Sequence, residues 1–308
     1  MDGKAGRTGW ARFWDRGRWW KALILTIGYL ALYEPASLLM APFVPFIGDA
    51  GSASYVLVLY VVPILIGALL LIGFGASVGW LRSLFARQRI QGRGWMWIAI
   101  AVVLLFNVLR FASIDYSAAG FDWVAAWLLA GLLIGFSEEV LTRGYVVRIM
   151  RSSGRSEIAV GLVSATLFAL LHGFNLFIGQ PLVPTLLQIL YTFFFGFCMY
   201  LALRVTGIIV APILLHASTD PSIFMQGTYP ATGGLASLAQ LGNIAVIFVG
   251  APEPDVVSSL GLHISSPLRK RPPIGAAQWP RRDGSVGEER AIAGLHHGNN
   301  TKLPGRRC

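Results

Sequence analysis

Residues 54–79 read SYVLVLYVVPILIGALLLIGFGASVG and contain no Asp, Glu, Lys, Arg or His. The hydrocarbon core of a bilayer is about 30 Å thick, so a helix needs roughly 20 apolar residues to cross it. This run exceeds that length without a single charge. We therefore predict that it forms a membrane-spanning helix.

Seven further apolar runs occur along the chain, which gives eight in all. The run at 207–222 is short. Together the eight runs predict an all-α fold, a polytopic transmembrane helical bundle of about eight spans over residues 22–251. The predicted spans are 22–43, 54–79, 95–113, 121–148, 157–177, 183–203, 207–222 and 234–251.

The composition agrees with a lipid environment. Of the 308 residues, 55% are hydrophobic and 13% are charged, and the mean hydropathy is +0.62. Soluble domains carry about a quarter charged residues. The net charge of +10 comes from basic residues in short clusters between apolar runs, a pattern typical of membrane topology. We predict an integral membrane protein that contacts the lipid bilayer and binds no nucleic acid.

The basic clusters alternate with loops that lack cations. Residues 44–54, 174–184 and 223–233 contain no Lys or Arg. Because Lys and Arg are retained in cytoplasmic loops, the alternation predicts that both termini lie in the cytoplasm, with the plasma (inner) membrane as the location. The clusters are Lys4, Arg7, Arg12, Arg16, Arg18 and Lys21 before the first span, Arg82, Arg87, Arg89 and Arg93 after the second, Arg148, Arg151 and Arg155 after the fourth, and Arg204 at the end of the sixth.

The two ends of the chain differ from the bundle in composition. Residues 1–21 interleave tryptophan and phenylalanine with basic residues, which is typical of a short helix at the headgroup level or of a cytoplasmic anchor. Residues 252–308 are rich in Pro, Gly and mixed charge, and we expect a disordered cytoplasmic tail there. The two cysteines, Cys198 and Cys308, offer no disulfide framework.

Ionisable residues are concentrated in three of the predicted spans. Each costs several kcal/mol inside a membrane unless it is paired or faces a polar cavity. Their depths, counted from the span ends, fall in the inner part of the bilayer and predict one buried polar site. The residues are Glu138, Glu139 and Arg143 in the run FSEEVLTR at 136–143, His172 in the fifth span, and His216 and Asp220 in the seventh.

Helical spacing suggests how these side chains face one another. Glu139 and Arg143 are four residues apart, so they share a helix face and can form an ion pair. Glu138 points about 100° away from Glu139 and is free to face another helix. His216 and Asp220 are also four residues apart, so Asp220 could orient the imidazole or bind a substrate backbone.

A buried glutamate beside two histidines is suited to activating water. Glu138 could accept a proton from water and return it to a leaving amine. His172 and His216 could stabilise the oxyanion by hydrogen bonding, or they could bind a zinc ion together with Glu138. The residues alone leave both options open.

Each part of this set also has a structural interpretation. An isolated pair such as Glu139–Arg143 is more often structural than catalytic, and a single intramembrane histidine is often an interhelical hydrogen-bond donor. Glu34, next to Pro35, is expected to fill a kink or a polar pocket. Structural contacts alone do not require these residue types in three separate spans, which favours a chemical site.

The motifs resemble a known family. Glu-Glu-x-x-x-Arg at 138–143, Phe-x-x-x-His at 168–172 and His-x-x-x-Asp at 216–220 are similar to those of the CPBP family of intramembrane proteases, also called Abi. That family includes the CaaX-prenyl endopeptidases of the Rce type. The resemblance covers residues 121–220, and three motifs in this order are more specific than any one alone.

The resemblance implies a role for the matching residues. Glu138 corresponds to the family's catalytic glutamate, and His172 to the histidine that helps it to activate water. His216 and Asp220 correspond to the pair that stabilises the oxyanion, where the family often has Asn in place of Asp.

The Glu139–Arg143 pair matches the remaining motif positions, which we interpret as structural support. The family has been described both as zinc-dependent and as glutamate-dependent without metal. The sequence therefore predicts a metalloprotease or a glutamate-dependent endopeptidase, with zinc as a possible cofactor.

The leading hypothesis is an intramembrane endopeptidase that cleaves a membrane-associated or CaaX-like protein or peptide substrate. An alternative is a non-catalytic membrane interaction protein, such as a bacteriocin-immunity or assembly factor, in which the polar residues are structural. A third is a proton-coupled transporter that uses the carboxylates as a relay. No internal repeat is evident in the sequence, which disfavours the transporter.

Overall fold

Helices account for almost all of the computed structural model, which describes residues 8–88 and 92–251. Within these residues there is no β-strand, and an isolated antiparallel bridge joins Ile114 to Pro230. The described residues belong to one structural unit. The predicted all-α class is confirmed for this part of the chain.

Six helical segments of the described part are long and apolar enough to cross a membrane, and they coincide with the first six predicted spans. An integral membrane protein built from helices is therefore supported. The segments consist of α2 (Trp20–Leu38) with η1 (Ala41–Phe46), α3 (Ala53–Val56) with η2 (Leu57–Val61) and α4 (Val62–Val78), η3 (Gly94–Met96) with α6 (Trp97–Phe111), α8 (Phe121–Glu139) with η4 (Val140–Val146) and α9 (Val147–Ser152), α10 (Glu157–Leu171) with η5 (His172–Leu176), and α11 (Leu182–Thr206).

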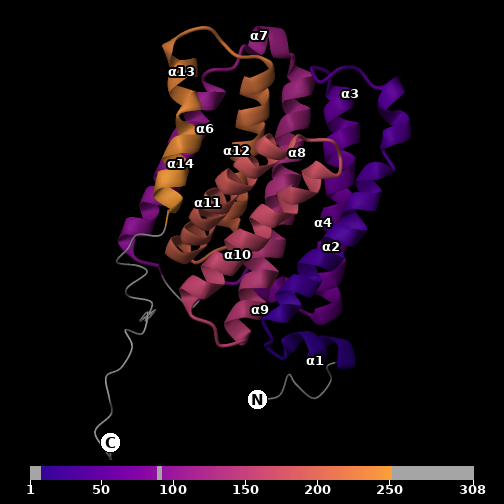
Figure 1. Ribbon diagram of the computed structural model, residues 1–308, viewed down its shortest axis with the longest axis vertical. Helices are drawn as coiled ribbons and strands as arrows, with labels where there is room; N and C mark the ends of the chain where they lie inside the picture. Colours follow the sequence, from indigo (N-terminus) through magenta and orange to yellow (C-terminus); the bar gives the residue numbers. More distant parts are fainter. Residues whose placement is uncertain (1–7, 89–91, 252–308) are drawn as a thin grey trace, which may run out of the picture. The chain divides into compact units, whose positions relative to one another are not determined.

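The last two predicted spans take a different form and are not among these six. The predicted span 207–222 corresponds to α12 (Val210–Thr228), which carries a proline inside the helix. The predicted span 234–251 is broken at Leu241 into α13 (Gly234–Gln240) and α14 (Gly242–Gly250). Figure 1 shows α12 next to α8, and α13 and α14 alongside α6.

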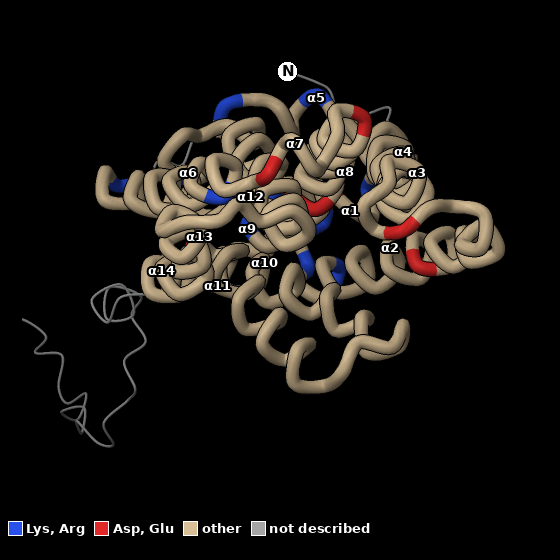
Figure 2. Tube along the Cα trace, turned by 90° about the horizontal axis from the view of Figure 1, so that it is seen from above, with Lys and Arg blue, Asp and Glu red and all other residues tan. Residues whose placement is uncertain are grey.

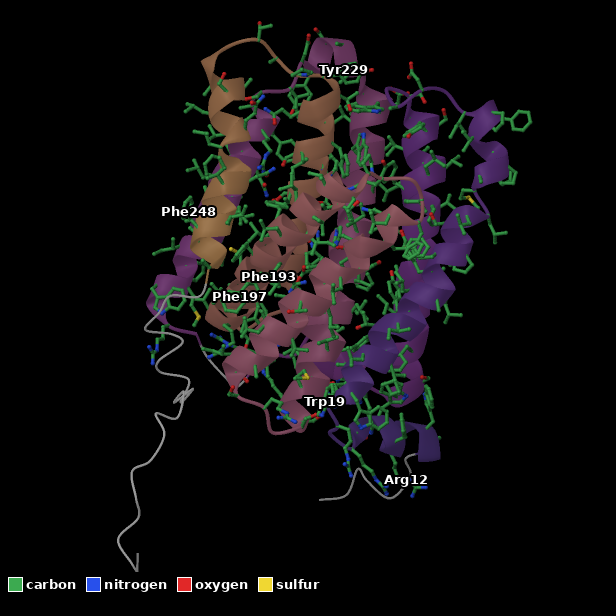
Figure 3. All side chains as sticks on the ribbon, in the orientation of Figure 1. Arg12, Trp19, Phe193, Phe197, Tyr229 and Phe248 are labelled. Carbon is green, nitrogen blue, oxygen red and sulfur yellow. The ribbon has the colours of Figure 1, made fainter. Side chains whose placement is uncertain are left out.

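Three short helices complete the described part: α1 (Gly9–Asp15), α5 (Leu81–Leu84) and α7 (Tyr116–Ala119). Helix α1 is the short helix predicted within residues 1–21, and it packs against the end of α4. The indole of Trp10 donates to Ser77 Oγ at 3.0 Å. Arg12 and Trp19 lie at the opposite end of the bundle from Tyr229 (Figure 3). The predicted tail, residues 252–308, lies outside the described residues.

Two glycines set the distance between α8 and α12. A Cβ at Gly135 would lie 2.7 Å from both Ala217 N and Ile213 O, closer than real side chains approach. A Cβ at Gly131, one turn earlier, would overlap the ring of Pro221. Small residues four apart allow helix backbones to pack closely in membranes. The close approach brings the carboxylates at the end of α8 to the polar face of α12.

We expect Gly135→Leu to destabilise the bundle, because the added side chain must push α12 away from α8. Overpacking of this kind costs about 1–3 kcal/mol. The measurement is thermal unfolding of purified protein in detergent. Gly73→Leu is the matched control, since a Cβ at Gly73 in α4 meets no atom within 4 Å. Equal melting temperatures for the two variants would contradict the close α8–α12 contact.

Candidate active site

Charged positions are few on the helices, and several lie among the helices rather than at the rim (Figure 2). The side chains of Glu139 and Arg143 are fully buried, and that of His216 is 2% exposed. Glu138 and Asp220 keep 21% and 25% of their side-chain surface exposed. The predicted site therefore combines a fully buried ion pair, Glu139 and Arg143, with two partly exposed carboxylates, those of Glu138 and Asp220.

The ion pair predicted from the spacing of Glu139 and Arg143 is confirmed. Arg143 Nη1 lies 3.1 Å from Glu139 Oε1, and its Nη2 donates to the carbonyl oxygen of Gly196 at 2.6 Å. The guanidinium carbon also lies 4.6 Å from the centre of the Phe168 ring. A Cβ at Gly196 would lie 2.8 Å from Arg143 Nη2, so the glycine makes room for the cation. The pair thus ties the end of α8 to α10 and α11.

The helix widens where this pair forms. Segment η4 is a π-helix that begins directly after Glu139, and such segments are frequent at functional sites. Side-chain hydroxyls bind the carbonyl groups here. Thr142 Oγ1 donates to Glu138 O at 2.5 Å, and Ser164 Oγ donates to Thr142 O at 3.0 Å. These contacts fix the backbone on which the two glutamates sit.

His216 is held in a defined orientation between three carboxylates. Its Nδ1 lies 2.9 Å from Glu139 Oε1, and because an ionised carboxylate only accepts, the ring donates this hydrogen bond. Its Nε2 lies 3.7 Å from Glu138 Oε2 and 3.6 Å from Asp220 Oδ2. The edge of Phe195 packs against the imidazole, with ring centres 5.0 Å apart. Nε2 of His216 therefore faces the partly exposed carboxylates of Glu138 and Asp220.

The sequence left two roles open for Asp220, orienting His216 or binding a substrate backbone, and in the structure the hydrogen bond that orients His216 is made by Glu139. The Asp220 carboxylate, at 3.6 Å from Nε2, is beyond direct hydrogen-bonding distance. Glu139 and His216 are 77 residues apart in the chain. No local spacing signals such a contact, so Glu139 was expected only to support Arg143.

An aromatic pair that was not predicted from the sequence lies near Glu138. Tyr29 and Tyr33 of α2 interact electrostatically with Glu138, and their rings stack with centres 5.5 Å apart. Among the described residues, Glu138 Oε2 and the Tyr29 hydroxyl have no hydrogen-bond partner. Tyrosines in an apolar helix look like core residues in a sequence. Their proximity to Glu138 follows from the packing of α2 against η4.

His172 lies near this group without joining it directly. It begins η5, its Nδ1 lies 3.1 Å from Phe168 O, and its ring packs edge-on against Phe168. It is close enough to Glu138 to interact with it electrostatically. The structure thus brings together Glu138, Glu139, Arg143, His216 and Asp220, with His172 beside them.

The fit to a metal ion can be judged from the same distances. Over residues 8–88 and 92–251, no three His, Cys, Asp or Glu side chains are arranged to hold a metal ion. Nδ1 is engaged in both histidines, by Glu139 in His216 and by a carbonyl in His172, which is also the usual arrangement of a histidine that binds a metal through Nε2. Zinc binding by Glu138, His172 and His216 therefore stays a prediction.

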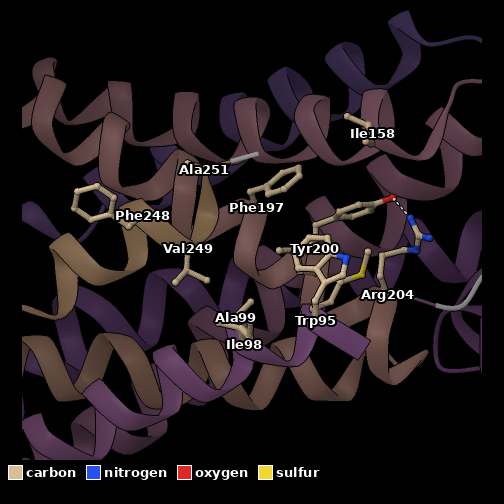
Figure 4. Close-up of a pocket in the computed structure, with 12 residues that line it drawn as sticks. Trp95, Ile98, Ala99, Ile158, Phe197, Tyr200, Arg204, Phe248, Val249 and Ala251 are labelled. Atoms are coloured by element: carbon tan, nitrogen blue, oxygen red, sulfur yellow. Dashed lines mark hydrogen bonds between the residues drawn. The ribbon is translucent and has the colours of Figure 1, made fainter. Parts of the chain in front are cut away.

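A cavity of about 230 Å³ opens elsewhere, between α6, α10, α11 and α14. Figure 4 shows Phe197, Phe248 and Val249 toward one side, and the Tyr200 hydroxyl joined to Arg204 at the other. None of the six predicted site residues lines it. The cavity is therefore distinct from the predicted site.

Residues 120–221 match the model of a family described as type II CAAX prenyl endopeptidase, Rce1-like. The segment contains all six predicted site residues and agrees with the resemblance to the CPBP family that the motifs indicated over residues 121–220. No curated protein and no solved structure matches the chain.

We expect Glu139→Gln to lower the free energy of unfolding by about 3–5 kcal/mol, because it leaves the Arg143 cation buried without a counter-charge. The double variant Glu139→Gln/Arg143→Met should lose less than the sum of the two single variants. The measurement is denaturant unfolding in detergent micelles, analysed as a double-mutant cycle.

Glu157, which pairs with both Arg151 and Arg204, serves as the comparison, because its side chain is 24% exposed whereas that of Glu139 is fully buried. Glu157→Gln should therefore cost less than Glu139→Gln. Additive losses in the cycle, or equal costs for the two glutamates, would show that the Glu139–Arg143 pair does not stabilise the fold as argued.

Proposed function

We propose that this chain is an intramembrane endopeptidase that hydrolyses a peptide bond of a membrane-associated or CaaX-like protein with water activated by Glu138. The observation that carries the proposal is the meeting of Glu138, His216 and Asp220 beside the buried Glu139–Arg143 pair, inside apolar helices. The family match over residues 120–221 supports it.

Glu138 is the general base of the proposed reaction. Its Oε2 has no hydrogen-bond partner among the described residues and lies 3.7 Å from His216 Nε2. Groups separated by more than 3.5 Å can share a bridging water. Glu138 takes a proton from that water as the water oxygen bonds to the carbonyl carbon of the substrate. The Phe168 carbonyl contacts Nδ1 of His172, so Nε2 of His172 can help to hold the water.

His216 stabilises the charge that develops on the carbonyl oxygen. Because Nδ1–H is donated to Glu139, Nε2 carries hydrogen in the imidazolium form and donates it to the oxyanion. Asp220, as a carboxylate, accepts a backbone N–H of the substrate and aligns the peptide. When the tetrahedral intermediate collapses, Glu138 returns its proton to the leaving amine and the C–N bond breaks.

The distribution of charge supports a topology for the proposed enzyme. We propose that both termini lie in the cytoplasm of a cell whose plasma (inner) membrane holds the protein. In this arrangement α12 and the broken pair α13–α14 complete an eight-pass bundle. The loops 44–54, 174–184 and 223–233, free of Lys and Arg, lie on the opposite side.

A non-catalytic interaction protein is the second candidate. The observation that favours it is the complete burial of Glu139 and Arg143, because such a pair can fix a bundle without any reaction. In that case Glu138 has no chemical task, and its replacement by an isosteric amide should spare function.

We expect Glu138→Gln to reduce peptide cleavage by at least about 100-fold, because the amide cannot take a proton from water. The measurement uses the purified protein in detergent with a panel of fluorogenic peptides, including prenylated C-terminal peptides. Glu34→Gln is the matched control, since it makes the same chemical change at another glutamate of a spanning segment and should keep full activity.

Both variants should elute as the wild type does on size exclusion, so that loss of activity is not loss of fold. A zinc chelator in a parallel series tests the zinc expectation for Glu138, His172 and His216. Full activity of Glu138→Gln would refute the proposed general base. Cleavage that a chelator abolishes and added zinc restores would refute the metal-free route.

The topology predicts that Cys308 reacts with a membrane-impermeant maleimide in inside-out vesicles and not in intact cells. Cys198 is buried and protected, and these are the two cysteines of the sequence. Mass spectrometry of the labelled protein measures the result. Labelling of Cys308 from outside intact cells would reverse the proposed orientation.

A further inference from the structure

Arg110 is a cation in a helix that is apolar enough to cross a membrane, and the proposed reaction does not use it. It lies near the end of α6 and is 4% exposed. Its Nη1 donates to Asn107 Oδ1 at 3.4 Å and its Nη2 to Asn243 Oδ1 at 2.9 Å. Both acceptors are neutral amide oxygens. They hold the guanidinium in place without balancing its charge.

No Asp or Glu of the described residues forms an ion pair with Arg110. Arg143, Arg151 and Arg204, by contrast, each pair with a glutamate. A buried ion without a counter-charge costs several kcal/mol, and intramembrane charges typically mark a functional site. The uncompensated charge of Arg110 therefore points to an anionic ligand.

Asn107 connects Arg110 to the helix that carries the active site. Its Nδ2 donates to Ser218 Oγ at 2.9 Å and to Thr219 Oγ1 at 2.8 Å. These two residues directly precede Asp220 on α12. The position of the guanidinium is therefore fixed relative to the catalytic carboxylates.

Tyr191 offers a second hydrogen-bond donor nearby. It interacts electrostatically with both Arg110 and Asp220, and its buried hydroxyl has no partner among the residues that the structure describes. Its ring stacks on Phe195 with centres 5.9 Å apart, and Phe195 in turn packs against His216. A phenol hydroxyl without a partner among the described residues thus lies near the guanidinium of Arg110.

The chain also leaves room for the guanidinium. A Cβ at Gly242, at the break between α13 and α14, would lie 2.5 Å from Arg110 Nη2. The absence of a side chain there lets Asn243 approach the cation from the neighbouring helix.

We propose that Arg110, together with the Tyr191 hydroxyl, binds the terminal α-carboxylate of the segment that cleavage releases. A guanidinium matches a carboxylate with two parallel hydrogen bonds, and the phenol supplies a third. The ligand also provides the negative charge that the two asparagines lack. This inference rests on the proposed function and assigns to Arg110 and Tyr191 the recognition of the C-terminus of its substrate.

The arrangement of helices fits a substrate in which only a short segment separates the scissile bond at Glu138 from the C-terminal carboxylate at Arg110. Helix α12 packs against α8, which carries Glu138, and against α6, which carries Arg110. The width of a helix is about 10 Å, and an extended chain covers about 3.5 Å per residue. A few residues are therefore enough to place the carboxylate at Arg110 when the scissile bond lies at Glu138.

The test measures binding to the Glu138→Gln protein, so that no cleavage intervenes. Two labelled CaaX-like peptides differ only in a free acid or an amide at the C-terminus, and fluorescence anisotropy in detergent gives their dissociation constants. We expect the acid to bind about tenfold more tightly or better. A third peptide, with a side-chain carboxylate and an amidated end, should bind like the amide and so distinguishes the two sources of a carboxylate.

Three substitutions are then made in the Glu138→Gln protein. Arg110→Gln should abolish the preference for the free-acid peptide, and Arg110→Lys should keep part of it. Tyr191→Phe should weaken it. Arg12→Gln, which removes an exposed cation on α1, is the control and should leave the preference intact. Tyr191→Phe removes a single oxygen atom, so it keeps the inference testable if Arg110→Gln does not fold.

Equal affinity for the acid and the amide, or a preference that survives Arg110→Gln, would overturn the carboxylate site. If cleavage depends on Glu138 but is equally fast for the free-acid and the amidated peptide, this inference is overturned and the proposed protease is not. An acid preference that depends on Arg110, in a protein that shows no Glu138-dependent cleavage, would support the carboxylate site and count against the proposed protease.

Discussion

The active-site region depends on one buried contact, the ion pair between Glu139 and Arg143. Both side chains are fully buried, so each charge is stable only while its partners stay in place. Arg143 also binds the Gly196 carbonyl, and Glu139 also accepts from His216. Because one charge network joins η4, α11 and α12, these elements cannot shift independently. The position of the His216 imidazole follows from the same network.

Two adjacent glutamates acquire different tasks because of where the helix widens. Glu139 is fully buried beside Arg143, whereas Glu138 is 21% exposed and faces His216 Nε2. The π-helix begins directly after them, with a hydroxyl–carbonyl contact from Thr142 back to Glu138. One carboxylate thus serves as a fixed counter-charge. The other has an oxygen without a hydrogen-bond partner among the described residues, as a base for water requires.

Properties that depend on neighbours along the chain could be predicted from the sequence. Apolar length predicted the six helices that can span a membrane, and four-residue spacing predicted the Glu139–Arg143 pair. The contact of Glu139 with His216 joins residues 77 positions apart, and no periodicity encodes it. The predicted span 234–251 is broken at Leu241, close to the contact of Asn243 with Arg110, and hydropathy alone does not predict a contact of this kind.

The carboxylates near α12 lie apart from the cation Arg110. Glu138, Glu139 and Asp220 gather around His216, whereas Arg110 lies against two asparagines and reaches α12 through Asn107.

Opposite charges attract strongly in a medium of low dielectric constant, so hydrogen bonds to fixed side chains must hold Arg110 where it is. A peptide with a free C-terminus would reduce the cost of that separation by placing its carboxylate at the cation. Binding energy gained there, away from the reacting carbonyl, would position the scissile bond at Glu138. Arg110, which has no acidic partner among the described residues, would then constrain the substrate as well as the fold.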